Sequence, residues 1–321
     1  MPPAASYRTP RPITPFTLTP TDEEMLLACA RYQYMTVEHW VRYFDDDGKR
    51  RYLQRRSQAL SDNDYLIRLY ITPLGGRGKG RSIFTHGPAG RKFAQSLGKR
   101  VPKRFRPIDV KTLNPRHLAH SEDLTDVLLS FDLLTRRDGR ITIAELLHER
   151  FLFEQRFKIP VSFTHPVTGE IRQEQAEVTP DAFAKVAGQV GGARRIFPLL
   201  MEVDRDTEEQ LDFREKIAKL YAFGTSETYE RVYQARSFNA AFIVQAPKRN
   251  PIDRLTEVLA WTERELRQRN VQHDAVSFSF CALDPATVSP EDLFLGTNWF
   301  HPFSTSPHAL IDLCEDLEGG V

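Results

Sequence analysis

The feature that most constrains the fold is an apolar run, Ile196 to Met201, which leads directly into Glu202-Val203-Asp204. Successive side chains of a strand point to opposite faces of a sheet, so we expect Glu202 and Asp204 to share one face while Val203 points to the other. Burying unpaired carboxylates is costly, so such acids need an accessible strand end, a metal ion, a base or a helix N-terminus. The segment therefore predicts a buried strand with two functional acids at its end.

A third acid, Asp181, lies in Thr179-Pro180-Asp181 and precedes Glu202 by 21 residues, a spacing that suits the adjacent strand of a hairpin. A helix expected from Thr207 to Phe223 carries Lys216 and Lys219. Three acids and a lysine are typical of a site that binds a divalent metal ion and positions a nucleophile. The alternative is three surface acids beside a solvated helix.

Charge is distributed unevenly along the chain. The net charge of the 321 residues is +1, but the segment from Lys49 to Arg106 holds sixteen Lys or Arg residues and only two acids, a local charge of +14. The rest of the chain therefore carries about −13. One segment is suited to a polyanion such as double-stranded DNA, and the remainder is not.

Three short helices are expected at the start of this region, after a proline-rich arm of residues 1–20 that we expect to be disordered. Thr21 with Glu24 predicts a capped helix from Asp22, with Met25, Leu26 and Cys29 on its apolar side, and Thr36 predicts a second helix through Phe44. The third helix, Lys49 to Leu60, presents Arg51, Arg55 and Arg56. Two helices followed by a basic helix are the pattern of a helix-turn-helix.

A strand at 65–70, a basic glycine-rich loop at 75–81 and a returning strand at 82–85 follow the third helix. This order predicts a winged helix over residues 21–98, in which the third helix enters a major groove and Arg77, Lys79 and Arg81 reach phosphates or a minor groove. The structural alternative is a winged helix that binds protein, with a solvated charged face.

A basic linker, 99–111, separates this region from a second domain, 112–321. A long amphipathic helix after Asn114 precedes strands at 161–165, 170–178, 196–204, 238–245 and 275–282, with helices at 207–223 and 252–269 and a short late element at 293–300. Leu211, Ile217 and Leu220 are expected to face the core, and residues 141–154 fit either a strand or a helix. The fold class is therefore α/β (α+β), with helices on a mixed central sheet.

Other features limit the class of protein. Three distant cysteines argue against a disulfide framework or a zinc site and favour a reducing, cytoplasmic location, and no apolar stretch is long enough for a membrane span. His117, His120 and Glu122 suggest metal ligands, but packing between helix and sheet also explains His120. His120 and Glu122 are therefore accessory candidates for the acid cluster, together with Lys219.

Several segments resemble the replication-relaxation family of plasmid and mobile-element proteins, in which a winged helix precedes a C-terminal domain. They are Leu118-Ala119-His120, Pro180-Asp181-Ala182-Phe183, Glu202-Val203-Asp204-Arg205-Asp206-Thr207-Glu208 and the lysine-containing helix that ends at Tyr221. The C-terminal part is also similar to the PD-(D/E)xK nucleases, which have a restriction-endonuclease-like fold. This resemblance implies that Asp181 and Glu202 bind Mg²⁺ or Mn²⁺ and that a lysine assists.

The chain departs from the nuclease pattern at Asp204, which occupies the position of the lysine. Lys216 is the candidate replacement, and Lys219, one turn further on, is the alternative. Two hypotheses follow. One is a Mg²⁺-dependent DNA endonuclease or nickase acting in replication or relaxation, with Asp181, Glu202, Asp204 and Lys216 as catalytic residues. The other is a non-catalytic DNA-binding regulator whose degenerate nuclease-like domain binds a partner or forms a homodimer.

Overall fold

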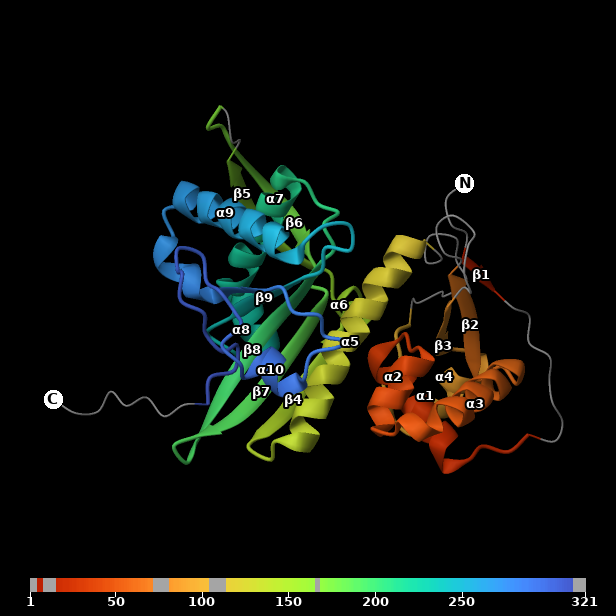
Figure 1. Cartoon of the computed structure of the whole chain (residues 1–321). Coiled ribbons are helices and arrows are strands. Elements are labelled where there is room, and N and C mark those ends of the chain that lie inside the picture. Colours follow the sequence, from red (N-terminus) through yellow and green to blue (C-terminus); the bar gives the residue numbers. More distant parts are fainter. Residues whose placement is uncertain (1–4, 8–15, 72–80, 104–113, 165–167, 314–321) are drawn as a thin grey trace. The chain divides into compact units, whose positions relative to one another are not determined.

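The computed structural model describes residues 5–7, 16–71, 81–103, 114–164 and 168–313 (Figure 1). Contacts divide the chain into two compact units, Met1–Leu129 and Ser130–Val321. The boundary falls within helix α5 (Pro115–Arg137), and part of the predicted linker, 104–111, lies outside the described residues. No helix in the described ranges has the length and apolar character that a membrane span needs.

Three helices open the first unit: α1 (Pro20–Tyr32), α2 (Val37–Phe44) and α3 (Arg50–Asp62), with a short 3₁₀ turn, η1 (Asp47–Lys49), before the third. Thr36 caps α2 as predicted. The predicted start of α1 is wrong, because Thr19 rather than Thr21 is the N-cap and its capping-box partner is Asp22. Pro20 occupies the first turn of the helix, where its missing N–H costs nothing.

A β-hairpin follows the three helices. Strands β2 (Leu66–Ile71) and β3 (Arg81–His86) pair antiparallel, and β1 (Ala5–Tyr7), within the predicted arm, adds to the free edge of β2. Helix α4 (Pro88–Ser96) packs against this hairpin. Gly90 permits the close approach, because a Cβ at that position would lie 2.1 Å from the carbonyl oxygen of Tyr65. The predicted order of three helices, two strands and a helix is confirmed from residue 20 onward, but the expectation of a disordered arm is wrong at 5–7, which form β1.

A five-stranded mixed sheet forms the centre of the second unit, in the order β10-β9-β8-β7-β4. Strand β7 pairs antiparallel with both β4 and β8, whereas β8, β9 and β10 run parallel to one another. Their bounds are β4 (Ile141–His148), β7 (Ala182–Val190), β8 (Ala193–Asp204), β9 (Asn239–Val244) and β10 (Phe278–Cys281). The predicted α/β class with a mixed sheet is confirmed.

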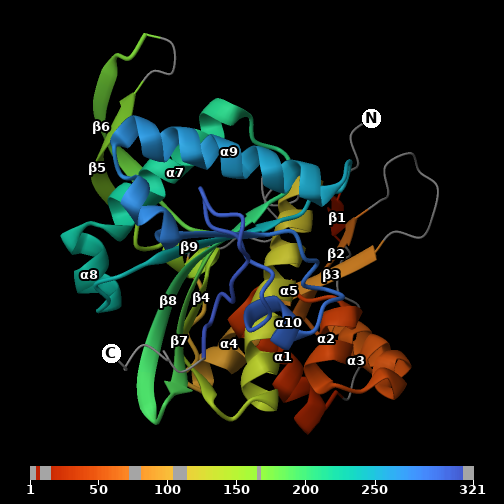
Figure 2. The same ribbon diagram turned by 60° about the vertical axis from the view of Figure 1, so that its left-hand side comes forward.

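Helices and a separate hairpin complete this unit (Figure 2). The helices are α6 (Glu149–Leu152), α7 (Gln210–Gly224), α8 (Glu227–Tyr233), α9 (Pro251–Arg269) and α10 (Pro290–Phe294), with the 3₁₀ helix η2 (Gln272–Ser277). Among the described residues, strands β5 (Phe157–Thr164) and β6 (Ile171–Val178) pair only with each other, and α7 packs on this hairpin and on α9. The ambiguous segment 141–154 is a strand followed by one helical turn, and the predicted strand at 275–282 begins late because η2 occupies its first half.

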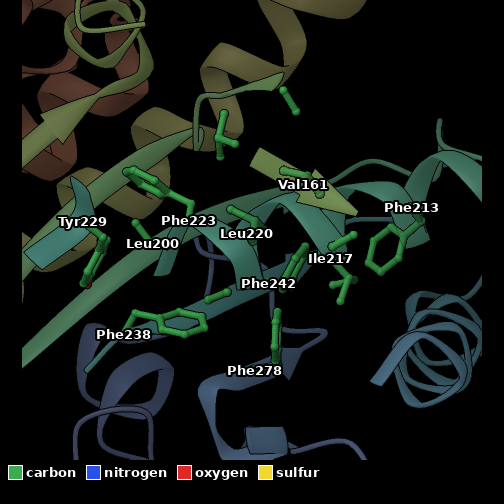
Figure 3. Packing of buried hydrophobic residues seen from close by; sticks show 14 of the residues in the cluster. Val161, Leu200, Phe213, Ile217, Leu220, Phe223, Tyr229, Phe238, Phe242 and Phe278 are labelled. Atoms are coloured by element: carbon green, nitrogen blue, oxygen red, sulfur yellow. The ribbon is translucent and has the colours of Figure 1, made fainter. Parts of the chain in front are cut away.

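The core of the second unit lies between the sheet and α7 (Figure 3). Leu200 on β8 and Phe242 on β9 are fully buried against Ile217 of α7. Leu211 was expected to face this core, but that expectation is wrong because it is 49 % exposed; Phe213, two residues later, is buried instead. Residues 200, 202 and 204 of β8 point to the same face of the sheet, because every second side chain of a strand does so. The strand that places Leu200 in the core therefore also points Glu202 and Asp204 toward the helices.

Candidate functional site

Three acids line up across neighbouring strands at one end of the central sheet. In the register of β7 and β8, Ala182 pairs with Met201, so the next position places Asp181 opposite Glu202. In the register of β4 and β7, His148 pairs with Ala182, so the next position places Glu149 opposite Asp181. The spacing argument for Asp181 and Glu202 is confirmed, and the sheet adds Glu149, which sequence reasoning missed.

Asp181 is anchored at the centre of this line. Its Oδ2 accepts a hydrogen bond of 2.8 Å from the backbone N–H of Val203, which fixes the carboxylate beside the end of β8. Carboxylate oxygens of Asp181 and Glu149 lie within 4.8 Å of each other. Asp181 is half-buried and Glu149 is buried, and Glu149 also has the Arg150 guanidinium 3.4 Å from its Oε1. The two acids are close enough to share one cation.

Glu202 is the most perturbed acid of the group. It is 3 % exposed, and burial together with repulsion from Asp181 raises its pKa to about 8, although the Lys216 ammonium opposes the shift. A carboxyl with such a pKa carries a proton in most molecules at pH 7, so it can donate as well as accept a hydrogen bond. Perturbed acids of this kind are concentrated at functional sites.

Lys216 supplies the positive charge at this end of the sheet. Its Nζ lies 3.3 Å from Glu202 Oε2 and 2.5 Å from Glu208 Oε1. Burial lowers the pKa of this ammonium, but attraction to Glu202, Glu208 and Asp181 more than offsets it, so the pKa is raised and the group stays charged. The other oxygen of Glu208, Oε2, is buried and has no hydrogen-bond partner among the described residues. The cluster therefore has more negative than positive groups.

Asp204 is engaged elsewhere. The Arg254 guanidinium of α9 makes two bonds to it, Nε to Oδ2 at 2.7 Å and Nη2 to Oδ1 at 3.1 Å. Both side chains are 2 % exposed, and Arg254 also packs on the ring of Trp261, 4.7 Å from its centroid. The two acids of the Glu-Val-Asp segment thus share a face, as predicted, but each is paired with a cation from a different helix.

The accessory candidates belong to two elements: Lys219 to α7, and His120 and Glu122 to α5. Lys219 lies on α7 with its ammonium 5.7 Å from the centroid of the Phe163 ring. Glu122 lies on α5 in the first unit, where Arg81 Nη2 contacts its Oε2 at 2.6 Å and burial raises its pKa to about 7. His120 is on the same helix and half-buried. Of the two candidate lysines, Lys216 is the one paired with Glu202.

The predicted DNA-binding arginines differ in their exposure and in whether they form ion pairs within the protein. Arg51 and Arg55 are exposed on α3. Arg56 is held by the fully buried Asp22, with Nε donating to Oδ1 at 2.8 Å, and Arg81 is paired with Glu122. Arg77 and Lys79 lie outside the described residues. Among the described arginines of the predicted interface, Arg51, Arg55 and Arg81 are therefore exposed, and Arg56 and Arg81 are paired within the protein.

Glu149 and Glu208 are the site residues that sequence reasoning missed. Glu149 lies in the segment where strand and helix could not be distinguished, so its position relative to Asp181 could not be derived. Glu208 belongs to the Glu-Val-Asp-Arg-Asp-Thr-Glu segment, and its position eight residues before Lys216 was the available signal. Glu208 precedes α7 and Lys216 lies within it. The carboxylate of Glu208 can therefore fold back to the Lys216 ammonium.

The donor set fits a hard divalent cation. Glu149 and Asp181 offer carboxylate oxygens within 4.8 Å of each other, which suit Mg²⁺ and Mn²⁺, and Glu202 lies opposite Asp181 in the strand register. With Glu208 included, one ammonium faces several carboxylates, so a cation would relieve repulsion that already raises the pKa of Glu202. The arrangement can hold a cation and place a fixed ammonium beside it.

Comparison of the chain with protein-family models, with curated proteins and with solved structures finds no match.

Proposed function

We propose that the protein is a DNA-binding protein of the replication-relaxation type, from a plasmid or mobile element, with a cation-dependent DNA-cleaving site in its second unit and a cytoplasmic location. The observation that carries the proposal is the convergence of Asp181, Glu202 and Lys216 from three elements, with Lys216 Nζ 3.3 Å from Glu202. These are the residue types of the PD-(D/E)xK pattern, with the lysine supplied by α7 instead of β8.

The chain's own groups have distinct roles in this proposal. Asp181 and Glu149 would hold Mg²⁺ or Mn²⁺, because their oxygens are close together and anchored. A bound divalent ion lowers the pKa of water and offsets charge on the scissile phosphate. Lys216 places a permanent positive charge beside Glu202, where it orients water or stabilises negative charge on the phosphate. Glu202, with a pKa of about 8, exchanges a proton near neutral pH.

The first unit would bring DNA to the protein. Helices α2 and α3 followed by the hairpin β2–β3 have the element order of a winged helix, and α3 exposes Arg51 and Arg55. The charge of +14 between Lys49 and Arg106 favours a polyanion. Double-stranded DNA is therefore the proposed partner.

A plasmid-nicking assay tests the cleavage part. Supercoiled plasmid is incubated with the full chain and Mg²⁺ or Mn²⁺, and the wild type should convert it to nicked or linear product. Asp181→Asn, Glu202→Gln and Lys216→Met should lower the rate at least 100-fold, as expected when one group that stabilises developing charge is removed. Lys219→Met and Asp212→Asn, an exposed acid on α7, are the matched controls and should retain activity.

Equal product from Asp181→Asn, Glu202→Gln and the wild type would assign the cleavage to a contaminant and remove the catalytic proposal. DNA binding without cleavage by the wild type would instead favour the second candidate, a non-catalytic regulator that binds a partner or forms a homodimer. One observation favours that candidate: Asp204 is fully occupied by Arg254.

A further inference from the structure

Strand β6 is an exposed edge of the hairpin that it forms with β5. Its residues Ile171 to Gln175 are all exposed, and Ile171 is 66 % exposed, the highest value among the large hydrophobic residues that the structure describes. Within the described ranges, β6 pairs with β5 alone, so one row of its backbone groups has no strand beside it. Figures 1 and 2 show one end of the hairpin projecting beyond α7 and α9. The edge is therefore open to another strand.

The opposite edge of the hairpin, along β5, is blocked. Pro160 has no N–H, and a proline inside a strand is tolerated where its nitrogen faces away from the neighbouring strand. The carbonyl oxygen of Ser162 accepts a hydrogen bond from the guanidinium of Arg269 on α9, so it also faces away from β6. Lys158, a residue type that discourages pairing at sheet edges, is exposed on the same strand. Residues 171–175 of β6 contain neither proline nor lysine and pair with β5 without a bulge.

The pairing of β5 with β6 determines which backbone groups of β6 face the open edge. Pro160 pairs with Gln175, and Ser162 pairs with Gln173. In an antiparallel ladder, pairs that exchange hydrogen bonds alternate with pairs whose N–H and C=O groups point away from each other. Because Pro160 and Ser162 face away from β6, Gln173 and Gln175 direct their N–H and C=O groups to the open edge. The same alternation places the groups of Ile171 there.

The charges of β6 are self-complementary about Gln173. Arg172 lies opposite Phe163 and Glu174 opposite Val161, so both are on the face that α7 covers, and they remain 60 % and 43 % exposed although they pair at 3.3 Å within the chain. A two-fold axis through Gln173 would place Arg172 of each copy opposite Glu174 of the other. An axis one residue earlier or later would instead place two arginines or two glutamates opposite each other. Charge therefore selects the register centred on Gln173.

We propose that β6 pairs with β6 of a second copy of this chain, antiparallel about Gln173, so that the two hairpins form one four-stranded sheet. Ile171, Gln173 and Gln175 of both copies then exchange roughly six backbone hydrogen bonds. Arg172 and Glu174 fall between these bonded pairs, where the side chains of opposing strands approach most closely. The inference does not depend on DNA binding or cleavage.

The second copy fits beside the helices that cover the hairpin. Helix α7 packs chiefly on β5, and in the four-stranded sheet the two β5 strands lie three strand spacings apart, roughly 14 Å. An α-helix is about 10 to 12 Å across, so the two α7 helices fit side by side. Helix α9 borders the far edge of β5 through Arg269, further from the junction. One strand edge buries less than the roughly 1,200 Å² at which stable interfaces begin, so we expect association in the micromolar range.

Sedimentation velocity of the full chain, from about 1 to 200 µM, covers the range expected for such an interface. In Arg172→Glu and in Glu174→Arg, both cross-strand pairs become like-charged, so the dissociation constant should rise at least about 10-fold. An equimolar mixture of the two variants should dimerise again, because each glutamate then faces an arginine of the other variant. The control, Arg231→Glu, reverses the charge of an exposed arginine on α8 and should leave the dissociation constant unchanged.

A backbone variant tests the edge independently of charge. The N–H of Gln173 faces the open edge, so Gln173→Pro removes the two central hydrogen bonds of the proposed pairing and none of those to β5. This variant should be a monomer over the whole concentration range, with a melting temperature close to that of the wild type. Circular dichroism checks that every variant is folded.

The outcomes are separable from those of the proposed function. A wild type that stays monomeric overturns the inference and leaves the edge to another protein or to solvent. A dimer that Gln173→Pro does not weaken also overturns it, because the contact then lies elsewhere. Loss of the dimer in both charge variants without recovery in their mixture overturns the pairing about Gln173. Each result stands whether or not the protein binds or cleaves DNA.

Discussion

Replacing one partner of the buried pair between Asp204 and Arg254 decides whether Asp204 is structural or catalytic. Arg254→Met keeps an aliphatic side chain but removes the guanidinium that packs on Trp261, and it leaves the Asp204 carboxylate, 2 % exposed, without its two guanidinium bonds of 2.7 and 3.1 Å. Removing one partner of a buried ion pair costs about 3 to 5 kcal/mol of unfolding free energy. In a unit of this size that corresponds to a fall in melting temperature of about 10 °C.

Urea unfolding followed by tryptophan fluorescence measures this loss. Asp204→Asn should destabilise the protein too, and the double variant Asp204→Asn/Arg254→Met should lose at least about 2 kcal/mol less than the sum of the single losses, because both changes break the same contact. Arg249→Met, which breaks a more exposed pair with Glu257, is the control and should cost at most about 1 kcal/mol. If Asp204→Asn left the unfolding free energy unchanged yet abolished cleavage, the structural assignment would be wrong.

Two further predictions concern the perturbed acids. The pKa of Glu202 in the folded protein, about 8, lies above its ordinary value of 4.5. The folded protein therefore binds this proton more tightly than the unfolded chain does. The contribution of this proton to stability is fully present below pH 4.5 and is lost as the pH rises through 8. Urea midpoints measured from pH 5 to 9 without divalent ions should therefore fall for the wild type and stay flatter for Glu202→Gln, and parallel curves would refute the assignment. In the first unit, Glu122→Gln removes the carboxylate that holds Arg81 at 2.6 Å, so duplex affinity at pH 8 should rise several-fold; an unchanged anisotropy titration would mean that Arg81 does not contact DNA.

Much of the fold follows from local patterns because apolar periodicity and capping residues act over a few residues. The helix after Thr36, the hairpin of β2 and β3 and the strand that ends in Glu202-Val203-Asp204 are all set this way. The start of α1 was misplaced because Thr19 and Thr21 each precede an acid by three residues, and Pro20 then favours the earlier cap. Leu211 fitted a helical apolar face, but it lies about 200° around α7 from Phe213, which is buried in its place.

The site was harder to predict than the fold because it depends on register between distant strands. Asp181 and Glu202 were brought together by a hairpin, which is a local feature. Glu149 joins them only because β4 pairs with the edge of β7. In that pairing His148 lies opposite Ala182, which follows it by 34 residues in the chain. Nothing in the residues around Glu149 specifies that pairing. The partner of Asp204 is equally distant, since Arg254 follows it by 50 residues on α9.

The pairing of Asp204 with Arg254 gives the residue at this position of β8 a structural role. Residues 202 and 204 face the same helical layer, both are buried, and each has a cation beside it. The side chains of Arg254 and Asp204 are each 2 % exposed, so their ion pair is buried. The side chain of Lys216 is 26 % exposed, and its ammonium contacts both Glu202 and Glu208. A sealed, bidentate pair cannot exchange partners without a large loss of stability, but a shared and partly accessible ammonium can. Asp204 therefore serves to hold α9 against the strand that presents Glu202, and the proposed chemistry is left to Glu149, Asp181, Glu202 and Lys216.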